Sequence, residues 1–155
     1  MDSVTIREAR RDDAPALSDL LTQLGYPTEA AQIPDRLDRM HARPGTIVLV
    51  AEHGGRPVGM GTVHLFSAMH CDEPAAWLTA LVVDESARGR GVGSALVKRA
   101  EELAVQHGAL NLALTSALHR TEAHEFYKNH GYEHTGVRLV KKFSKAATSP
   151  TTQRT

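Results

Sequence analysis

The sequence predicts an α/β (α+β) domain with a mixed sheet of six to seven strands and about four helices. Segments rich in β-branched residues or alternating in polarity are interleaved with segments whose apolar residues recur at helical spacing. Two strand segments, 46–52 and 57–66, are joined by a Gly-Gly pair and predict an early hairpin. Residues 77–84 are apolar on both faces, which is typical of a central strand covered on both sides.

The N-terminal part predicts one strand followed by two helical segments. Residues 4–8 alternate between apolar and polar side chains and predict the first strand. A helix begins at residues 12–15, where two acidic residues precede an Ala-Pro pair, and it ends at Gly25. A second helical segment covers about 29–42, and Pro34 inside it predicts a break or a kink.

The central part of the sequence, residues 57–106, predicts a strand that contains two glycines and, after it, a strand–turn–helix unit. Gly59 and Gly61 weaken the strand 57–66, and they predict a bulge there or the close approach of another element. The apolar strand 77–84 leads through a glycine-rich turn into an amphipathic helix over 92–106.

The last part predicts two further strand regions and a short helix. Residues 110–115 read as another buried strand, and Thr121 caps a helix that ends before Gly131. Residues 132–143 predict a last strand or strand pair. Residues 144–155 are rich in Ser, Thr, Ala and Pro and predict a disordered tail.

Composition restricts the classes of function. The length of 155 residues fits a single domain, which we place over 1–143. Lys plus Arg and Asp plus Glu each number 18, and this balance argues against a nucleic acid as the main partner. Cys71 is the only cysteine, which fits a reducing compartment. No apolar run approaches the ~20 residues of a membrane span, so we expect a cytoplasmic protein with no membrane partner.

Residues 88–94, Arg-Gly-Arg-Gly-Val-Gly-Ser, lie between an apolar strand and an amphipathic helix. This order of elements is the local geometry that holds a pyrophosphate. Glycines let the backbone approach phosphate oxygens closely, and the unpaired N–H groups of the first helical turn point at the anion. Arg88 and Arg90 add cationic donors. A plain tight turn, in which glycine serves only to reach a positive φ, is the alternative interpretation.

Two well-known phosphate signatures do not fit this turn. The nucleoside-triphosphate loop requires a lysine after its glycines, and the dinucleotide fingerprint requires a glycine where this chain has Ser94 or Leu96. The pattern that fits is Arg-x-x-Gly-x-Gly, formed by Arg88, Gly91 and Gly93.

A second motif lies in the short helix that follows. Ala123, Phe126, Tyr127 and His130 are spaced so that they share one helix face. Core packing by itself explains an apolar face of this kind, with the tyrosine hydroxyl bound to a backbone group.

Together the two motifs resemble those of the Gcn5-related N-acetyltransferases. The Arg-x-x-Gly-x-Gly turn resembles their acetyl-CoA signature, and Ala123, Phe126, Tyr127 and the Gly131-Tyr132 pair match the later motif in the same order. The resemblance implies a mostly antiparallel sheet, splayed where the strands at Leu81 and Leu114 diverge. It also implies acetyl-CoA as co-substrate, with its pantetheine arm in that gap.

The resemblance assigns the site residues as follows. Tyr127 would lie near the sulfur and act as general acid toward the departing thiolate. The residues expected to contact the coenzyme are Leu81, Val82, Val83, Arg88, Gly89, Arg90, Gly91, Val92, Gly93, Ser94, Arg120 and Phe126.

The chain also departs from the family pattern. Trp77 stands where many relatives place a glutamate base, and Arg120 replaces an asparagine and is expected to reach a phosphate instead. Histidines offer substitute bases because imidazole titrates near neutral pH. His119 is the preferred candidate, and the alternatives left open are His64, His124 and Glu52.

The predicted function is transfer of an acetyl group from acetyl-CoA to a primary amine by direct attack. No metal is expected, because His70-Cys71-Asp72 lacks a second cluster with ligand spacing. The mixed charge of residues 25–43 favours a small-molecule acceptor over an aminoglycoside. A protein or peptide amine, a coenzyme sensor without catalysis and a homodimer remain open.

Overall fold

The computed structural model describes residues 3–115 and 121–144. By its contacts the chain divides into two compact units, residues 1–114 and residues 115–155, and each is described by itself. The single domain expected over 1–143 therefore stays a prediction. Residues 145–155, most of the predicted tail, lie outside the described residues.

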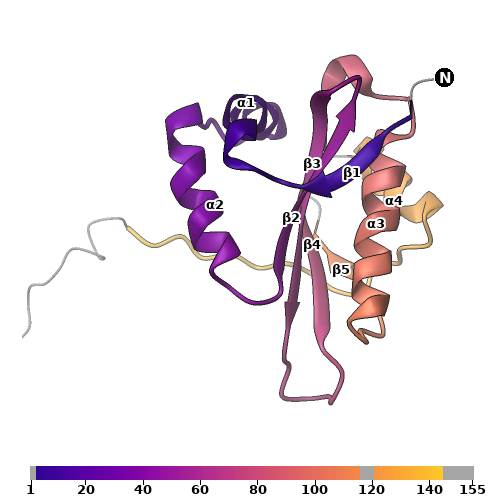
Figure 1. Ribbon diagram of the computed structural model, residues 1–155. Coiled ribbons are helices and arrows are strands. Elements are labelled where there is room, and N and C mark those ends of the chain that lie inside the picture. Colours follow the sequence, from indigo (N-terminus) through magenta and orange to yellow (C-terminus); the bar gives the residue numbers. More distant parts are fainter. Residues whose placement is uncertain (1–2, 116–120, 145–155) are drawn as a thin grey trace, which may run out of the picture. The chain divides into compact units, whose positions relative to one another are not determined.

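The first unit is built on a mixed sheet of five strands in the order β1-β2-β3-β4-β5 (Figure 1). The strands are β1 (Thr5–Glu8), β2 (Thr46–His53), β3 (Arg56–Phe66), β4 (Ala75–Val83) and β5 (Ala113–Leu114). The first three neighbouring pairs are antiparallel and only β4 and β5 are parallel. The predicted mixed, mostly antiparallel α/β fold is confirmed, as is the hairpin over Gly54 and Gly55.

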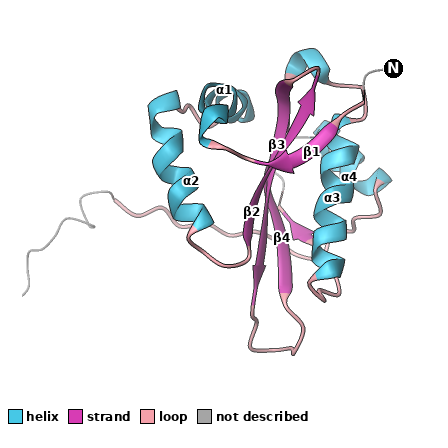
Figure 2. Ribbon diagram, in the orientation of Figure 1, coloured by secondary structure: helices cyan, strands magenta, loops and turns pink. Residues whose placement is uncertain are grey.

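Helices cover both faces of this sheet (Figure 2). One face carries α1 (Ala14–Leu24) and α2 (Ile33–His41), and the other carries α3 (Val92–Gln106). Gly25 ends α1 with a φ of 113°, as the sequence predicts. The predicted break at Pro34 is also present. A 3₁₀ turn over Ala30–Gln32 precedes α2, and the proline stands in the first turn of that helix, where its missing N–H costs nothing.

Two apolar layers hold the sheet between these helices. On the first face, Leu17 and Leu20 of α1 pack with Val50 of β2 and Met60 of β3. On the other face, Leu96 of α3 is fully buried. A Cβ atom built on Gly59 would lie 3.1 Å from the side chain of Leu96. The predicted close approach at this glycine is therefore the seating of α3 on β3.

The strand count is lower than predicted, for a physical reason. The strand expected over 110–115 is reduced to the two residues of β5. The strand or strand pair expected over 132–143 is not formed, and the side chains of Leu139 and Phe143 there are 88% and 80% exposed. Alternating apolar residues indicate a preference for burial, but a strand also requires a neighbour for its backbone groups, and this segment has no ladder partner among the described residues.

The second unit contains α4 (Thr121–Asn129). Gly131, with a φ of 87°, closes the helix. The Tyr132 N–H donates to the Tyr127 carbonyl at 3.0 Å, and the Gly131 N–H donates to the Lys128 carbonyl at 3.0 Å. The Gly-Tyr pair of the second motif is thus the helix stop. Across the described residues of both units, we find no helix with the length and apolarity needed to cross a membrane.

Candidate active site

The backbone of β4 is distorted at its centre. Ala80 has a φ of 55°, and it is the only residue other than glycine with a positive φ among the described residues. The β3–β4 register slips at the same point, so that Gly61 alone faces both Ala80 and Leu81. A Cβ atom on Gly61 would lie 3.3 Å from the Leu81 side chain. The bulge predicted from the glycines of β3 therefore lies in β4, and Gly61 makes room for it.

Among the described residues, one edge of β4 has no neighbouring strand beyond Leu78. The short β5 pairs only with Trp77 and Leu78. From Thr79 to Val83, no strand of the described chain pairs with that edge. Backbone groups of β4 that point to this edge are available to an extended ligand, which would bind as an additional strand. The divergence expected between the strands at Leu81 and Leu114 is consistent with this pairing.

The turn after β4 presents main-chain amides. Gly89 and Gly91 adopt φ values of 78° and 82°, and Gly91 is the N-cap of α3. Within the described part of the chain, no group accepts a hydrogen bond from the amides of Gly89, Arg90, Gly91, Val92 and Gly93. These N–H groups lie at the N-terminus of a helix of 15 residues, the positive end of its dipole, which is a favourable place for an anion.

The two arginines of the turn differ in their contacts. The Arg88 Nε donates to the Val83 carbonyl at 3.1 Å, which ties the turn to the end of β4. Both arginine residues are exposed, and the Arg90 guanidinium makes no hydrogen bond or ion pair within the described residues. Both arginines therefore retain donors for a phosphate group.

A glutamine from α1 fixes the start of this turn. Gln23 Nε2 donates to Asp84 Oδ1 at 2.7 Å, and Gln23 Oε1 accepts from the Glu85 N–H at 3.0 Å. Ser86 also donates to Asp84, through both its hydroxyl and its amide. The hydrogen bonds from Ser86 and Gln23 hold the pKa of Asp84 below its usual value. No local sequence pattern indicates Gln23, because its partners are more than 60 positions away.

The predicted acid and its neighbours lie on α4, in the second unit. The rings of Phe126 and Tyr127 meet edge to face with centroids 5.3 Å apart, and Tyr127 contacts Tyr132 in the same manner at 6.0 Å. The predicted base His119 and the predicted phosphate ligand Arg120 lie outside the described residues.

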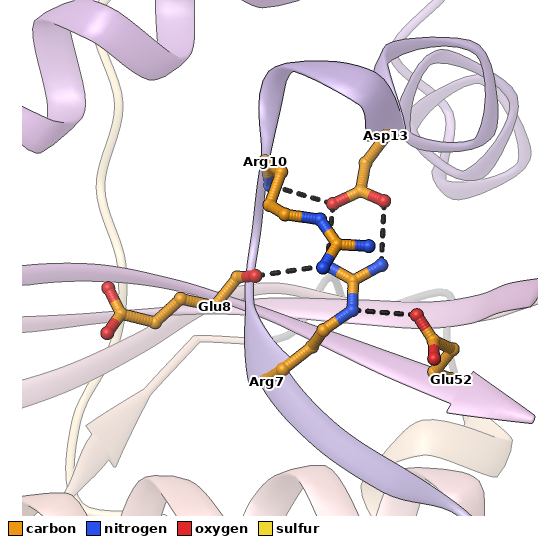
Figure 3. A network of polar contacts seen from close by, with 5 residues as sticks. All are labelled: Arg7, Glu8, Arg10, Asp13 and Glu52. Atoms are coloured by element: carbon orange, nitrogen blue, oxygen red, sulfur yellow. Dashed lines mark hydrogen bonds and ion pairs between the residues drawn. The ribbon is translucent and has the colours of Figure 1, made fainter. Parts of the chain in front are cut away.

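Glu52, an alternative base, is part of a charge network at the start of α1 (Figure 3). Its carboxylate accepts from Arg7 Nε at 2.7 Å, and Arg7 also binds both oxygens of Asp13 at 2.8 Å. Asp13 is only 4% exposed. Burial by itself would raise the pKa of Asp13, but hydrogen bonds from Arg7 and from the Arg10 amide hold it below the usual value. Because Glu52 is the second anchor of Arg7, its geometry indicates a structural role.

The alternative base His64 lies on β3, and its Nε2 is 3.0 Å from Thr79 Oγ1. His124, the third alternative, is half-buried on α4. Among the described residues, no three His, Cys, Asp or Glu side chains come together in a way that would hold a metal ion.

The family, sequence and structure comparisons all match this chain to acetyltransferases. Residues 6–132 match the acetyltransferase (GNAT) family. The chain is 34% identical over 98 residues to an aminoalkylphosphonate N-acetyltransferase of Salmonella typhimurium, a match that covers 63% of this chain and 64% of that relative. It is 28% identical to the uncharacterized N-acetyltransferase YhfO of Bacillus subtilis, over 84% of this chain and 90% of that one. A solved structure of a putative acetyltransferase from Agrobacterium tumefaciens, 28% identical, superimposes with a TM-score of 0.79 over 88% of this chain and 99% of its own.

Proposed function

The chain belongs to the GNAT family of N-acetyltransferases, and we propose that it transfers the acetyl group of acetyl-CoA to the primary amine of a small molecule. Enzymes of this family use acetyl-CoA. The observation that carries the proposal is the set of amides from Gly89 to Gly93 that have no acceptor among the described residues, placed directly after the part of β4 that β5 does not reach. One ligand with an extended arm and a diphosphate matches both features. A cytoplasmic location stays a prediction.

In this proposal the coenzyme lies along the first unit. The diphosphate binds the amides of residues 89–94, with Arg88 and Arg90 as cationic partners. The pantetheine arm pairs with the free edge of β4 at Leu81 and Val83. The thioester then lies near the bulge at Ala80, where a backbone N–H of β4 polarises the carbonyl oxygen.

The chemistry is a direct attack. The amine nitrogen forms a bond to the thioester carbon, the carbonyl oxygen takes up negative charge, and the C–S bond then breaks. Tyr127 donates a proton to the departing sulfur, since the proton affinity of a phenolate, with a pKa near 10, is close to that of a thiolate. The neighbouring rings of Phe126 and Tyr132 support the tyrosine in a fixed orientation.

A small acceptor with an anionic group fits the acceptor side best. The region of α2 carries Arg36, Arg39 and Arg43 beside Glu29 and Asp35, and none of the three arginines forms an ion pair with a carboxylate in the described residues. These cations suit an aminoalkylphosphonate, the class of compound named for the relative from Salmonella typhimurium. They are unfavourable for a polycationic aminoglycoside.

The test is the release of free coenzyme A thiol from acetyl-CoA in the presence of a panel of amines. The panel contains 2-aminoethylphosphonate, simple alkylamines, amino acids, a lysine peptide and an aminoglycoside, with a control that contains no amine. We expect 2-aminoethylphosphonate to accelerate thiol release most. Binding of acetyl-CoA without acceleration by any amine would favour the alternative function, a coenzyme sensor, over catalysis.

A further inference from the structure

A histidine and a threonine are joined across two strands beside the β4 bulge. On β3, His64 shares its side of the sheet with Met60, which packs in the core under α1. On β4, Thr79 is the register partner of Thr62, which lies two residues from both Met60 and His64 and so shares their side of the sheet. His64 Nε2 lies 3.0 Å from Thr79 Oγ1, and both side chains are half-buried. The pair therefore lies on the α1 and α2 side of the sheet, one residue from the backbone distortion.

The surroundings of His64 keep its imidazole neutral. Its neighbours on the same side of the sheet are Thr46 on β2 and Trp77 and Thr79 on β4, and none of them is ionised near neutral pH. No ion pair in the described part of the chain includes His64. Burial lowers the pKa of His64 below its usual value. A neutral imidazole at pH 7 is able to accept a proton, whereas Glu52 is occupied by Arg7.

From this geometry we propose that His64 is the general base that deprotonates the acceptor ammonium, with the Thr79 hydroxyl as the proton relay. The inference rests on the proposed acetyltransferase function and deepens it. An ammonium ion has no lone pair, so removal of one proton must precede attack on the thioester. Trp77, opposite His64 in the β3–β4 register, offers no such chemistry.

The ammonium gives one proton to Thr79 Oγ1 while the threonine hydroxyl gives its own proton to His64 Nε2, which leaves a neutral amine and an imidazolium. The amine attacks the carbonyl carbon, the C–N bond forms and the C–S bond breaks. The second proton lost from nitrogen balances the proton that the thiolate receives. The imidazolium then releases its proton to solvent, so each turnover yields one amide, one thiol and one proton.

The test compares His64→Gln with the matched control His70→Gln, a histidine in the exposed β3–β4 connection. Glutamine retains a hydrogen-bonding group for Thr79 but does not take up a proton. With the amine that reacts fastest in the panel, we expect kcat of His64→Gln at pH 7 to fall at least 100-fold, within the usual range for a general base. We expect the Kd of acetyl-CoA and the Tm to remain close to those of His70→Gln.

The pH dependence separates a base from a structural histidine. In His64→Gln the rate should rise about tenfold for each pH unit as the free amine fraction increases, so the deficit relative to wild type closes toward high pH. A deficit that is constant over pH, or one below threefold at pH 7, would overturn the proposal. If His64→Gln does not fold, Thr79→Val and Thr79→Ser test the proposal instead. The valine variant, which lacks the hydroxyl, must lose kcat, and the serine variant, which keeps it, must have a kcat close to that of wild type. Wild-type turnover of an amine tests the acetyltransferase function separately.

Discussion

Replacement of Gly91 by alanine tests the coenzyme-binding turn, and the chain supplies a matched control. Gly91 has a φ of 82°, and Gly55, in the β2–β3 hairpin, has a φ of 76°. A Cβ atom built on either glycine meets no other atom within 4 Å. Gly91→Ala and Gly55→Ala therefore introduce the same backbone strain and no clash within the protein. Only the first variant alters the surface on which we place the diphosphate.

The expected magnitudes follow from that strain. A residue with a Cβ atom costs roughly 1–2 kcal/mol in the left-handed region, and the reduced entropy of the unfolded chain returns about 0.4–1 kcal/mol. Each variant should lose about 1 kcal/mol of folding free energy, or roughly 2–4 °C in Tm. In Gly91→Ala the added methyl group holds the phosphates away from the amides, and we expect acetyl-CoA affinity to fall at least tenfold, about 1.4 kcal/mol.

Calorimetric titration with acetyl-CoA and thermal unfolding without ligand provide the two measurements. Similar losses in Tm for the two variants, with weaker acetyl-CoA binding in Gly91→Ala alone, are the expected result. If Gly91→Ala binds acetyl-CoA as tightly as Gly55→Ala does, the phosphates bind elsewhere and the reasoning from the free amides is wrong.

Three further predictions concern separate parts of the molecule. Gln23→Leu should weaken acetyl-CoA binding about three- to tenfold in the same titration, because it removes hydrogen bonds that fix the turn; unchanged affinity would argue against this positioning role. Tyr127→Phe should lower kcat with little change in the Kd of acetyl-CoA, and full turnover would refute the acid role. Asp13→Asn should cost about 3 kcal/mol at pH 7 in urea unfolding. Because the pKa of Asp13 is lowered on folding, its contribution is present above about pH 4 and is lost at lower pH, so the difference between wild type and variant should shrink in acid; a difference independent of pH would contradict this.

Local patterns in the sequence predicted the parts of the site that are continuous in the chain. The glycine-rich run over 88–94 predicted a turn between a strand and a helix, and the amphipathic pattern after it predicted α3. Gly131 likewise predicted the end of α4. Each of these features is decided by the residue's own conformational freedom or by neighbours within one helical turn, and a single sequence contains that information.

Features that depend on how separate elements pack together could not be predicted from the sequence. The pairing of His64 with Thr79 and the clamp from Gln23 to Asp84 join residues on different elements, and only the folded sheet sets their distances. The positive φ of Ala80 arises from the slip between β3 and β4 rather than from alanine itself, although Gly61 gave an indirect signal. The strand expected over 132–143 failed for the related reason that an apolar pattern does not specify a partner.

Amide chemical shifts test the central claim most directly. In a ¹H–¹⁵N spectrum of the labelled protein titrated with acetyl-CoA, the resonances of Gly89, Gly91 and Gly93 should move strongly downfield as their N–H groups begin to donate to phosphate oxygens. Those of Gly54 and Gly55, at the hairpin, should stay in place. A saturable titration that moves other resonances and leaves those three glycines unshifted would contradict the account.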